Sequence, residues 1–199
     1  NTVEIAVNDS LSPSRLFAFV AVVFQLLSAQ VHAEDCEETQ AKLTRPFPNF
    51  WGIDEHSTRF VPEESTSISA ANVHRLKLKW AYGLETNSPR SYPLVTENTI
   101  FFGDSGAGLL ALDRETGCVR WRHKDSRGNV ASAILSRVTE SGLTLYFTGR
   151  REGAFAVDAT KGKTIWKATI TQEPVPLYYG KPLLADGKIF VSISSEEVG

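Results

Sequence analysis

The sequence has few cysteines and histidines and almost no net charge. It contains no methionine, two cysteines and four histidines, and its formal net charge is −2. The histidines are scattered without the spacing of metal ligands. A charge so close to neutral gives no electrostatic basis for binding nucleic acid or an anionic membrane surface. We therefore expect no zinc site and no nucleic-acid partner.

Long apolar runs are also lacking, apart from one near the beginning. Residues 16–27 read LFAFVAVVFQLL and follow Arg15, but this run is too short to span a bilayer comfortably. The sequence Val31-His32-Ala33 fits the small-x-small rule for signal cleavage. We interpret residues 1–33 as a signal peptide with upstream residues. The alternative is an uncleaved anchor or a buried helix.

Export sets further expectations. It predicts a periplasmic or secreted protein with no membrane span in the mature chain. In an oxidising compartment Cys36 and Cys118 could pair, but their spacing does not decide between a structural bridge and two unrelated thiols. Neither cysteine lies in a Cys-x-x-Cys-His motif, so we expect no c-type haem here. Because residue 1 is Asn and methionine is absent, we expect a fragment at the start.

A repeated unit organises the rest of the sequence. Residues 111–121 and 156–166 align without gaps, and Ala, Asp, Gly and Trp recur at an offset of 45 positions. An earlier partial copy ends at Trp80. Periods of about 40–45 residues are typical of propeller blades. The pattern predicts an all-β fold, a partial β-propeller, in which residues 34–74 are a lead-in segment and residues 75–199 form the first blades.

Each repeat is predicted to be a hairpin. Asp113 and Asp158 can accept hydrogen bonds from backbone N–H groups two or three residues on, and Gly117 and Gly162 can supply a positive φ. Asp186-Gly187 is a further hairpin signal. No sustained 3.6-residue apolar period follows the signal peptide, so few helices are expected.

One tryptophan per repeat, at a fixed place, favours packing between blades over ligand stacking. A buried indole covers much apolar area and needs one partner for its N–H group. A blade buries its faces only against neighbours, so two or three blades cannot close a ring. We therefore expect a longer propeller, and we expect residues 1–199 to be inactive alone.

The unit Ala-x-Asp-x-x-x-Gly-x-x-x-Trp, present twice, resembles the repeat of quinoprotein alcohol dehydrogenases, which use pyrroloquinoline quinone (PQQ). The lead-in Ala71–Trp80 also resembles them. Three segments are similar to the polyvinyl alcohol dehydrogenase branch: Arg90-Ser91-Tyr92-Pro93, Thr116-Gly117-Cys118 and residues 191–197. The resemblance covers residues 50–199.

This resemblance implies a fold and an activity. The family propeller has eight blades, with PQQ over the central channel, a Ca²⁺ ion on the quinone, an Asp base and a cytochrome c that accepts the electrons. It implies an exported PQQ- and Ca²⁺-dependent alcohol dehydrogenase. The alcohol substrate would be a secondary alcohol, and polyvinyl alcohol is one candidate. The catalytic Asp would lie beyond residue 199.

The resemblance also identifies candidate site residues. Glu197 would ligate Ca²⁺, with Glu196 as the alternative register, and carboxylate oxygen suits that cation. Arg90 would pair with the PQQ carboxylates. Ser194 and Ser195 would donate hydrogen bonds to PQQ. The alternative for each charged residue is a solvated loop position.

Two positions depart from the family pattern. Ala131 stands where the family tends to carry Arg, and Tyr179 stands where a cofactor-binding Thr is common. A lost guanidinium would weaken recognition of an anionic cofactor. These departures motivate a second hypothesis, a non-enzymatic repeat propeller that acts as a scaffold of the periplasm or outer membrane. A sugar dehydrogenase of the same fold is a third.

Overall fold

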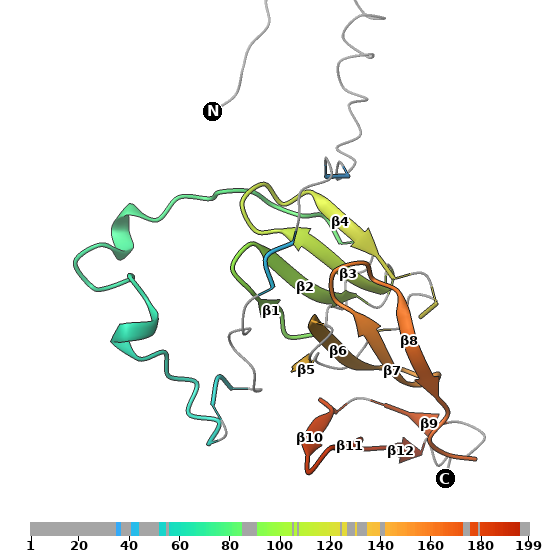
Figure 1. The fold of residues 1–199 in the computed structure, drawn as a ribbon. Helices are drawn as coiled ribbons and strands as arrows, with labels where there is room; N and C mark the ends of the chain where they lie inside the picture. The colour runs from blue at the N-terminus through green and yellow to red at the C-terminus, as the bar shows by residue number, and fades with distance from the viewer. Residues whose placement is uncertain are drawn as a thin grey trace, which may run out of the picture. The chain divides into compact units, whose positions relative to one another are not determined.

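In a computed structural model of the chain, the regular secondary structure of the described residues is almost entirely antiparallel sheet (Figure 1). The chain divides into two units, Asn1–His32 and Ala33–Gly199, and every described residue belongs to the second. The described residues are 35–36, 41–43, 52–54, 56–84, 91–104, 106, 108–123, 125–126, 130, 135–139, 142–172, 176–178 and 180–195. The predicted signal peptide, residues 1–33, lies outside them.

Blade 1 is a four-stranded meander in the order β1-β2-β3-β4. Its strands are β1 (Leu94–Val95), β2 (Thr99–Asp104), β3 (Gly108–Asp113) and β4 (Val119–Arg122). Every residue of β3 is buried, because this strand has a neighbour on both edges and is covered on both faces.

Blade 2 repeats this arrangement in the order β5-β6-β7-β8. Its strands are β5 (Leu135–Thr139), β6 (Gly142–Gly149), β7 (Gly153–Asp158) and β8 (Thr164–Ala168). The register shifts between Ala111 and Leu112 in blade 1 and between Ala156 and Val157 in blade 2. The two shifts lie 45 positions apart, so the sequence repeat is also a repeat of strand pairing.

The predicted turns are confirmed. Asp113 accepts hydrogen bonds from the N–H groups of Glu115 and Thr116, and Asp158 accepts those of the residues at the equivalent places in blade 2. Gly117 has a φ of 78°, a value that side-chain-bearing residues rarely adopt.

Blades 1 and 2 share one hydrophobic core. Because side chains alternate between the faces of a strand, every second residue of the central strands faces the neighbouring blade. Leu109 and Ala111 of β3 contribute from blade 1, and Phe147 and Phe155 contribute from blade 2. The two phenylalanine rings are stacked, with centroids 5.0 Å apart. The core therefore joins the blades rather than lying within either sheet.

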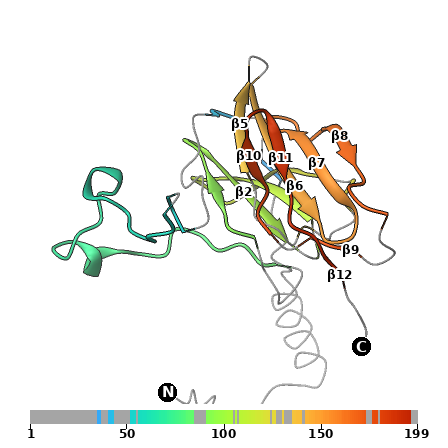
Figure 2. The ribbon, with the colours of Figure 1, turned by 90° about the horizontal axis from the view of Figure 1, so that it is seen from below.

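A third, smaller set of strands follows blade 2. The hairpin β10 (Leu183–Ala185) and β11 (Lys188–Phe190) pairs across Asp186-Gly187, as predicted. Leu184 and Ile189 pack against Tyr146 and Ala156, which face away from the first core. Figure 2 shows this hairpin over blade 2. A separate pair joins β9 (Pro176–Leu177) to β12 (Ser194–Ser195).

The lead-in segment carries two short 3₁₀ turns, η1 (Glu63–Ser65) and η2 (Val73–Arg75). Both views show residues 56–84 as a long excursion outside the sheets (Figures 1 and 2). Phe60 and Leu78 are exposed on it, at 66% and 85%. Within the described part of the chain, no helix has the length and apolar character needed to cross a membrane.

Candidate functional site

The structure describes two of the predicted site residues. Ser194 and Ser195 form β12, opposite Leu177 and Pro176 of β9, and Ser194 is exposed. Arg90 and Glu197 lie outside the described residues. The same is true of the departures from the family pattern, Ala131 and Tyr179, and of the alternative ligand Glu196.

Several contacts show that residues next to these positions in the sequence lie at one end of the sheets. A Cβ atom on Gly103, at the end of β2, would lie 3.0 Å from the Ser91 Oγ atom and against the Val130 side chain. Val130 in turn forms a bridge with Gly149 at the end of β6. Ser91 and Val130 both precede the first strand of a blade, so the first strands begin where the second strands end.

The same series continues beyond blade 2. The Tyr178 N–H group donates a hydrogen bond to the Arg150 carbonyl oxygen, 3.0 Å away. A Cβ atom on Gly180 would collide with the Ser192 Oγ atom, and Ser194 follows two residues later. We call this end of the sheets the rim, defined by Ser91, Gly103, Val130, Gly149, Arg150, Tyr178, Gly180, Ser192 and Ser194.

Two rim hydroxyl groups are buried without a hydrogen-bond partner among the described residues. They are the Oγ atom of Ser91 and the Oη atom of Tyr178, whose residue is only 1% exposed. An unsatisfied buried hydroxyl costs about 1–3 kcal/mol. The rim therefore has two buried hydroxyl groups with unused hydrogen-bonding capacity among the described residues.

The rim also carries positive charge. Arg150 is half-buried in the turn between β6 and β7, whereas Arg151 is exposed. Lys181 lies directly after Gly180, and burial lowers the pKa of its amine to about 8. The described residues contain no group of three or more His, Cys, Asp or Glu side chains that could hold a metal ion.

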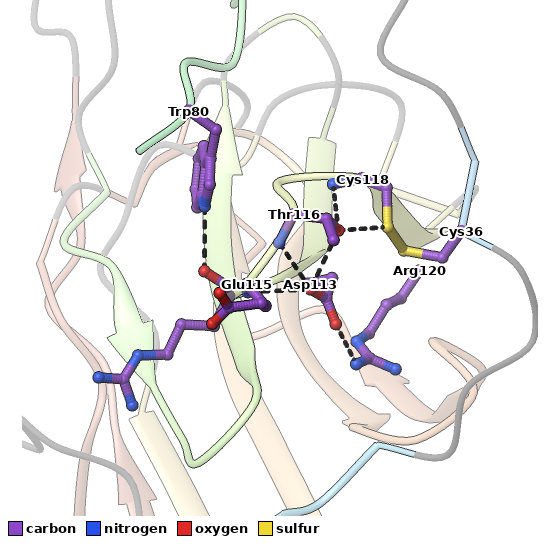
Figure 3. The surroundings of a disulfide bond; sticks show 8 residues. Cys36, Trp80, Asp113, Glu115, Thr116, Cys118 and Arg120 are labelled. Atoms are coloured by element: carbon purple, nitrogen blue, oxygen red, sulfur yellow. Dashed lines mark hydrogen bonds and ion pairs between the residues drawn. A yellow bond between two sulfur atoms is a disulfide. The ribbon is translucent and has the colours of Figure 1, made fainter. Parts of the chain in front are cut away.

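The disulfide left open by the sequence is present, and it lies at the Asp113 turn. Cys36 is bonded to Cys118, and the Cys36 N–H group donates to the Val119 carbonyl oxygen at 2.9 Å. Figure 3 shows Trp80 on the other side of the same turn. Cys36 of the lead-in segment and Trp80, which follows that segment, therefore hold one turn of blade 1.

Asp113 is the centre of this turn. Its carboxylate also pairs with the Arg120 guanidinium, and both side chains are nearly buried (Figure 3). Burial alone would raise the pKa of Asp113, but the hydrogen bonds from Thr116 and Glu115 and the charge of Arg120 together lower it. The carboxylate therefore stays ionised, in a structural role.

A buried histidine lies between the blades. The His123 Nε2 atom is 2.9 Å from the Thr164 Oγ1 atom, and the Thr164 hydroxyl donates to the Asp125 carboxylate. Because Thr164 donates its proton to Asp125, His123 must donate from Nε2. Its ring meets Phe147 and Phe155 edge-on, with centroids 5.5 Å and 5.6 Å apart.

The repeated docking of indoles on turns defines the class of protein. The Trp121 Nε1 atom donates to the Ala159 carbonyl oxygen of the next blade at 3.0 Å, so blades are joined in sequence order as in a β-propeller. Trp166 is 38% exposed, because no Asp-x-x-x-Gly turn follows β8 among the described residues. The packing interpretation is thus confirmed for Trp80 and Trp121.

Comparison with known proteins gives the family. The model of the PQQ-repeat family described as "Outer membrane protein assembly factor BamB" matches residues 39–199. The chain belongs to this family.

Curated relatives give a more specific similarity. The chain is 34% identical over 150 residues to a polyvinylalcohol dehydrogenase of Pseudomonas sp. and 30% identical over 150 residues to one of Sphingopyxis sp. (strain 113P3). Both alignments cover 74% of this chain, and they span 23% and 22% of the relatives' lengths. The chain therefore spans less than a quarter of the length of these two relatives.

A solved structure supports the fold. The quinohemoprotein alcohol dehydrogenase from Comamonas testosteroni matches with a TM-score of 0.60 and 24% identity, over 77% of this chain and 24% of that one. The predicted partial propeller is therefore confirmed.

Sequence reasoning missed three features of the described residues. Ser91 directly follows Arg90, a predicted cofactor-binding residue, and Tyr178 directly precedes Tyr179, which departs from the family pattern. Their position next to these residues could have identified them. His123 was set aside with the other histidines, because no spacing in the sequence connects it to Thr164.

Proposed function

We propose that this chain is the N-terminal part of an exported PQQ- and Ca²⁺-dependent alcohol dehydrogenase that oxidises secondary alcohols. Polyvinyl alcohol is one candidate substrate, and a cytochrome c is the proposed electron acceptor. The observation that carries the proposal is the rim, where Ser91, Tyr178 and Ser194 lie along one series of contacts. The similarity to polyvinylalcohol dehydrogenases supports the choice of chemistry.

Each proposed role follows from the residue's chemistry. Arg90 would pair with PQQ carboxylates in a bidentate way, which adds geometric selectivity to charge. Ser194 and Ser195 would donate hydrogen bonds, as would the unpartnered hydroxyl groups of Ser91 and Tyr178. Glu197 would supply carboxylate oxygen to Ca²⁺. When bound, PQQ supplies the redox chemistry and Ca²⁺ the Lewis acidity.

The test uses the full-length protein. PQQ is titrated with and without Ca²⁺, and binding is followed by fluorescence quenching. Dye reduction is then assayed with secondary alcohols, including polyvinyl alcohol. We expect saturable, Ca²⁺-dependent binding and alcohol-dependent reduction. Absence of PQQ binding would reject the proposal.

A variant pair tests the Arg90 role. Arg90→Gln removes a charge-assisted hydrogen bond of about 1.5–3 kcal/mol, so the Kd for PQQ should rise about ten- to a hundredfold. Arg75→Gln is the control, because Arg75 is exposed in η2. An equal, small effect in both variants would remove Arg90 from the site.

A second candidate is a non-enzymatic propeller scaffold of the periplasm or outer membrane. The observation that favours it is the assembly-factor description of the matching family. This candidate predicts no PQQ binding under any Ca²⁺ concentration, so the same titration separates the two. An adjacent Cys-Cys pair followed by Arg-Gly in the remaining sequence would favour the enzyme.

A further inference from the structure

His123 connects blade 1 to blade 2, although it belongs to neither sheet. It directly follows β4, and its backbone N–H group donates to the Leu109 carbonyl oxygen of β3 at 2.8 Å. Its side chain instead contacts blade 2, where it meets Thr164 at the start of β8 and the stacked rings of Phe147 and Phe155. The backbone of His123 is therefore fixed to one blade and its ring to the next.

The surroundings of the ring suit a neutral imidazole. Because the Thr164 hydroxyl donates to Asp125, the imidazole keeps its hydrogen on Nε2 and a lone pair on Nδ1. The Nδ1 atom is buried without a hydrogen-bond partner among the described residues, and the side chain is only 1% exposed. A second proton would turn Nδ1 into a buried donor with no acceptor, and would bury a charge as well. The site therefore disfavours the imidazolium ion.

The charged groups around the ring do not compensate for that proton. The Asp125 carboxylate lies 3.8 Å from Nε2, but its side chain is 61% exposed, so solvent screens the attraction. Lys167 of β8 brings a cation to the other contact of the ring, 4.9 Å from the centroid of Phe155. Glu152, in the turn before β7, lies 4.0 Å from the Lys167 Nζ atom and partly offsets it. Burial, Asp125 and Lys167 together lower the pKa of His123.

We propose that His123 makes the contact between blades 1 and 2 sensitive to pH: when the ring is protonated, it leaves Phe147 and Phe155, and blade 1 separates locally from β8. In water both N–H groups of the imidazolium find acceptors, which the buried site does not offer. Local opening therefore becomes more favourable as the pH falls below the ordinary histidine value of about 6.5. The opening needs no ligand and no change in any other residue.

The segment that His123 begins leads to the rim. Ser126 follows three residues later and is fully buried, and Val130 follows four residues after that and bridges Gly149. His123 is thus an anchor of the connection that ends at Val130. When the ring leaves blade 2, this connection loses one of its fixed points, so the bridge between Val130 and Gly149 should also open more often. The local opening therefore connects the pH to the rim.

Two alternative roles of His123 predict different results. A histidine with a packing role alone would hold the blades together equally well at any pH. An imidazolium that stays in place and pairs with Asp125 would hold them more tightly in acid. The buried Nδ1 atom and the exposure of Asp125 favour opening over both alternatives.

Amide hydrogen exchange on the full-length protein tests the proposal, with each rate divided by the intrinsic rate at the same pH. Linkage to one proton that binds the open state near pH 6.5 raises the opening constant about tenfold between about pH 7.5 and 5.5. The protection of the His123 amide should therefore fall about tenfold over this range. Protection in the hairpin β10–β11, which packs on Tyr146 and Ala156 instead, should stay constant.

A matched pair of variants assigns the effect to one residue. His123→Gln keeps a side-chain N–H group for Thr164 but binds no proton in this range, so the pH dependence should disappear. His74→Gln is the control, because His74 is exposed in η2, and it should keep the tenfold fall.

The wild-type series decides the matter by itself if His123→Gln does not fold. Constant or rising protection of the His123 amide in acid would overturn the proposal, as would an equal fall in the hairpin β10–β11. A fall that persists in His123→Gln would also overturn it. Neither PQQ nor alcohol is used, so the outcome is separate from the proposed activity.

Discussion

The Trp121 indole lies flat against Gly162 of the next blade and donates its N–H group to Ala159, 3.0 Å away. The same ring packs against Phe101 of its own blade, at a centroid distance of 5.8 Å. One side chain therefore touches its own blade, the neighbouring turn and a backbone carbonyl. The joint between blades is built from a contact that recurs with the sequence repeat.

Two glycine variants separate the indole contact from backbone strain. Gly162 and Gly187 have similar positive φ values, 66° and 71°, but only Gly162 has a neighbour within 4 Å. Gly187→Ala should cost about 1 kcal/mol from strain alone. Gly162→Ala should cost about 1–3 kcal/mol more from overpacking. Urea midpoints of the full-length protein measure both, and equal losses would refute the packing role.

The two turn aspartates form a second matched pair. Asp113→Asn leaves the buried Arg120 without its carboxylate, so it should destabilise by about 3 kcal/mol. Asp158→Asn keeps an Oδ1 acceptor for the two turn N–H groups and only weakens these hydrogen bonds by removing the charge. Since no ion pair of Asp158 is found in the described residues, this change should cost about 1 kcal/mol or less. Chemical denaturation at pH 7 compares them. A larger loss at Asp158 would contradict the role of the ion pair.

The Asp113 contribution also depends on pH in a definite direction. Its pKa is lowered from 3.8 in the folded protein, so the unfolded state binds more protons as the pH falls below that value. The advantage of the wild type over Asp113→Asn should be constant above about pH 5. It should decline only as the pH falls through 3.8 and below.

The disulfide should contribute through the unfolded state. The two cysteines are 82 residues apart, and cross-linking a loop of this length is expected to stabilise by about 4 kcal/mol. The double variant Cys36→Ser, Cys118→Ser should lose about 2–5 kcal/mol. Thermal unfolding with and without a thiol reductant checks this. The unfolding temperature of the variant should not change with reductant. An equal change in the wild type and the variant would contradict a stabilising role of the disulfide.

His123 should make stability fall on mild acidification. Burial lowers its pKa from 6.5, the nearby Asp125 carboxylate raises it, and Lys167 lowers it again, with a net decrease. The folded state therefore binds fewer protons than the unfolded state below about pH 6.5, and stability is lost as the pH falls from there. His123→Gln should flatten this part of the profile. Matching wild-type and variant slopes between pH 7.5 and 5 would refute it.

The repeat made the blades predictable, because most contacts that define them recur at a fixed offset. Asp113, Gly117 and Trp121 lie within one unit, and their turn and strand follow from local chemistry. The docking of Trp121 on Gly162 then follows from adding one period. The exposure of the Trp166 side chain could not be predicted in this way, because its burial depends on a turn that follows β8.

Other features could not be predicted from the sequence, because they depend on contacts between segments that are distant in the chain. The pairing of Cys36 with Cys118 depends on a bridge between Asp35 and Val119, which no spacing reveals. The rim depends on how Ser91 and Tyr178 are brought to one end of neighbouring sheets. Arg90 and Glu197 lie outside the described residues, so their roles stay predictions.

The disulfide also decides what a protease can release. Residues 56–84 are largely exposed, and they lie inside the covalent loop closed by Cys36 and Cys118. A single cut there opens the backbone but frees no piece, because both fragments stay attached through sulfur. Nicked molecules would run as one band on a denaturing gel and would separate only after reduction.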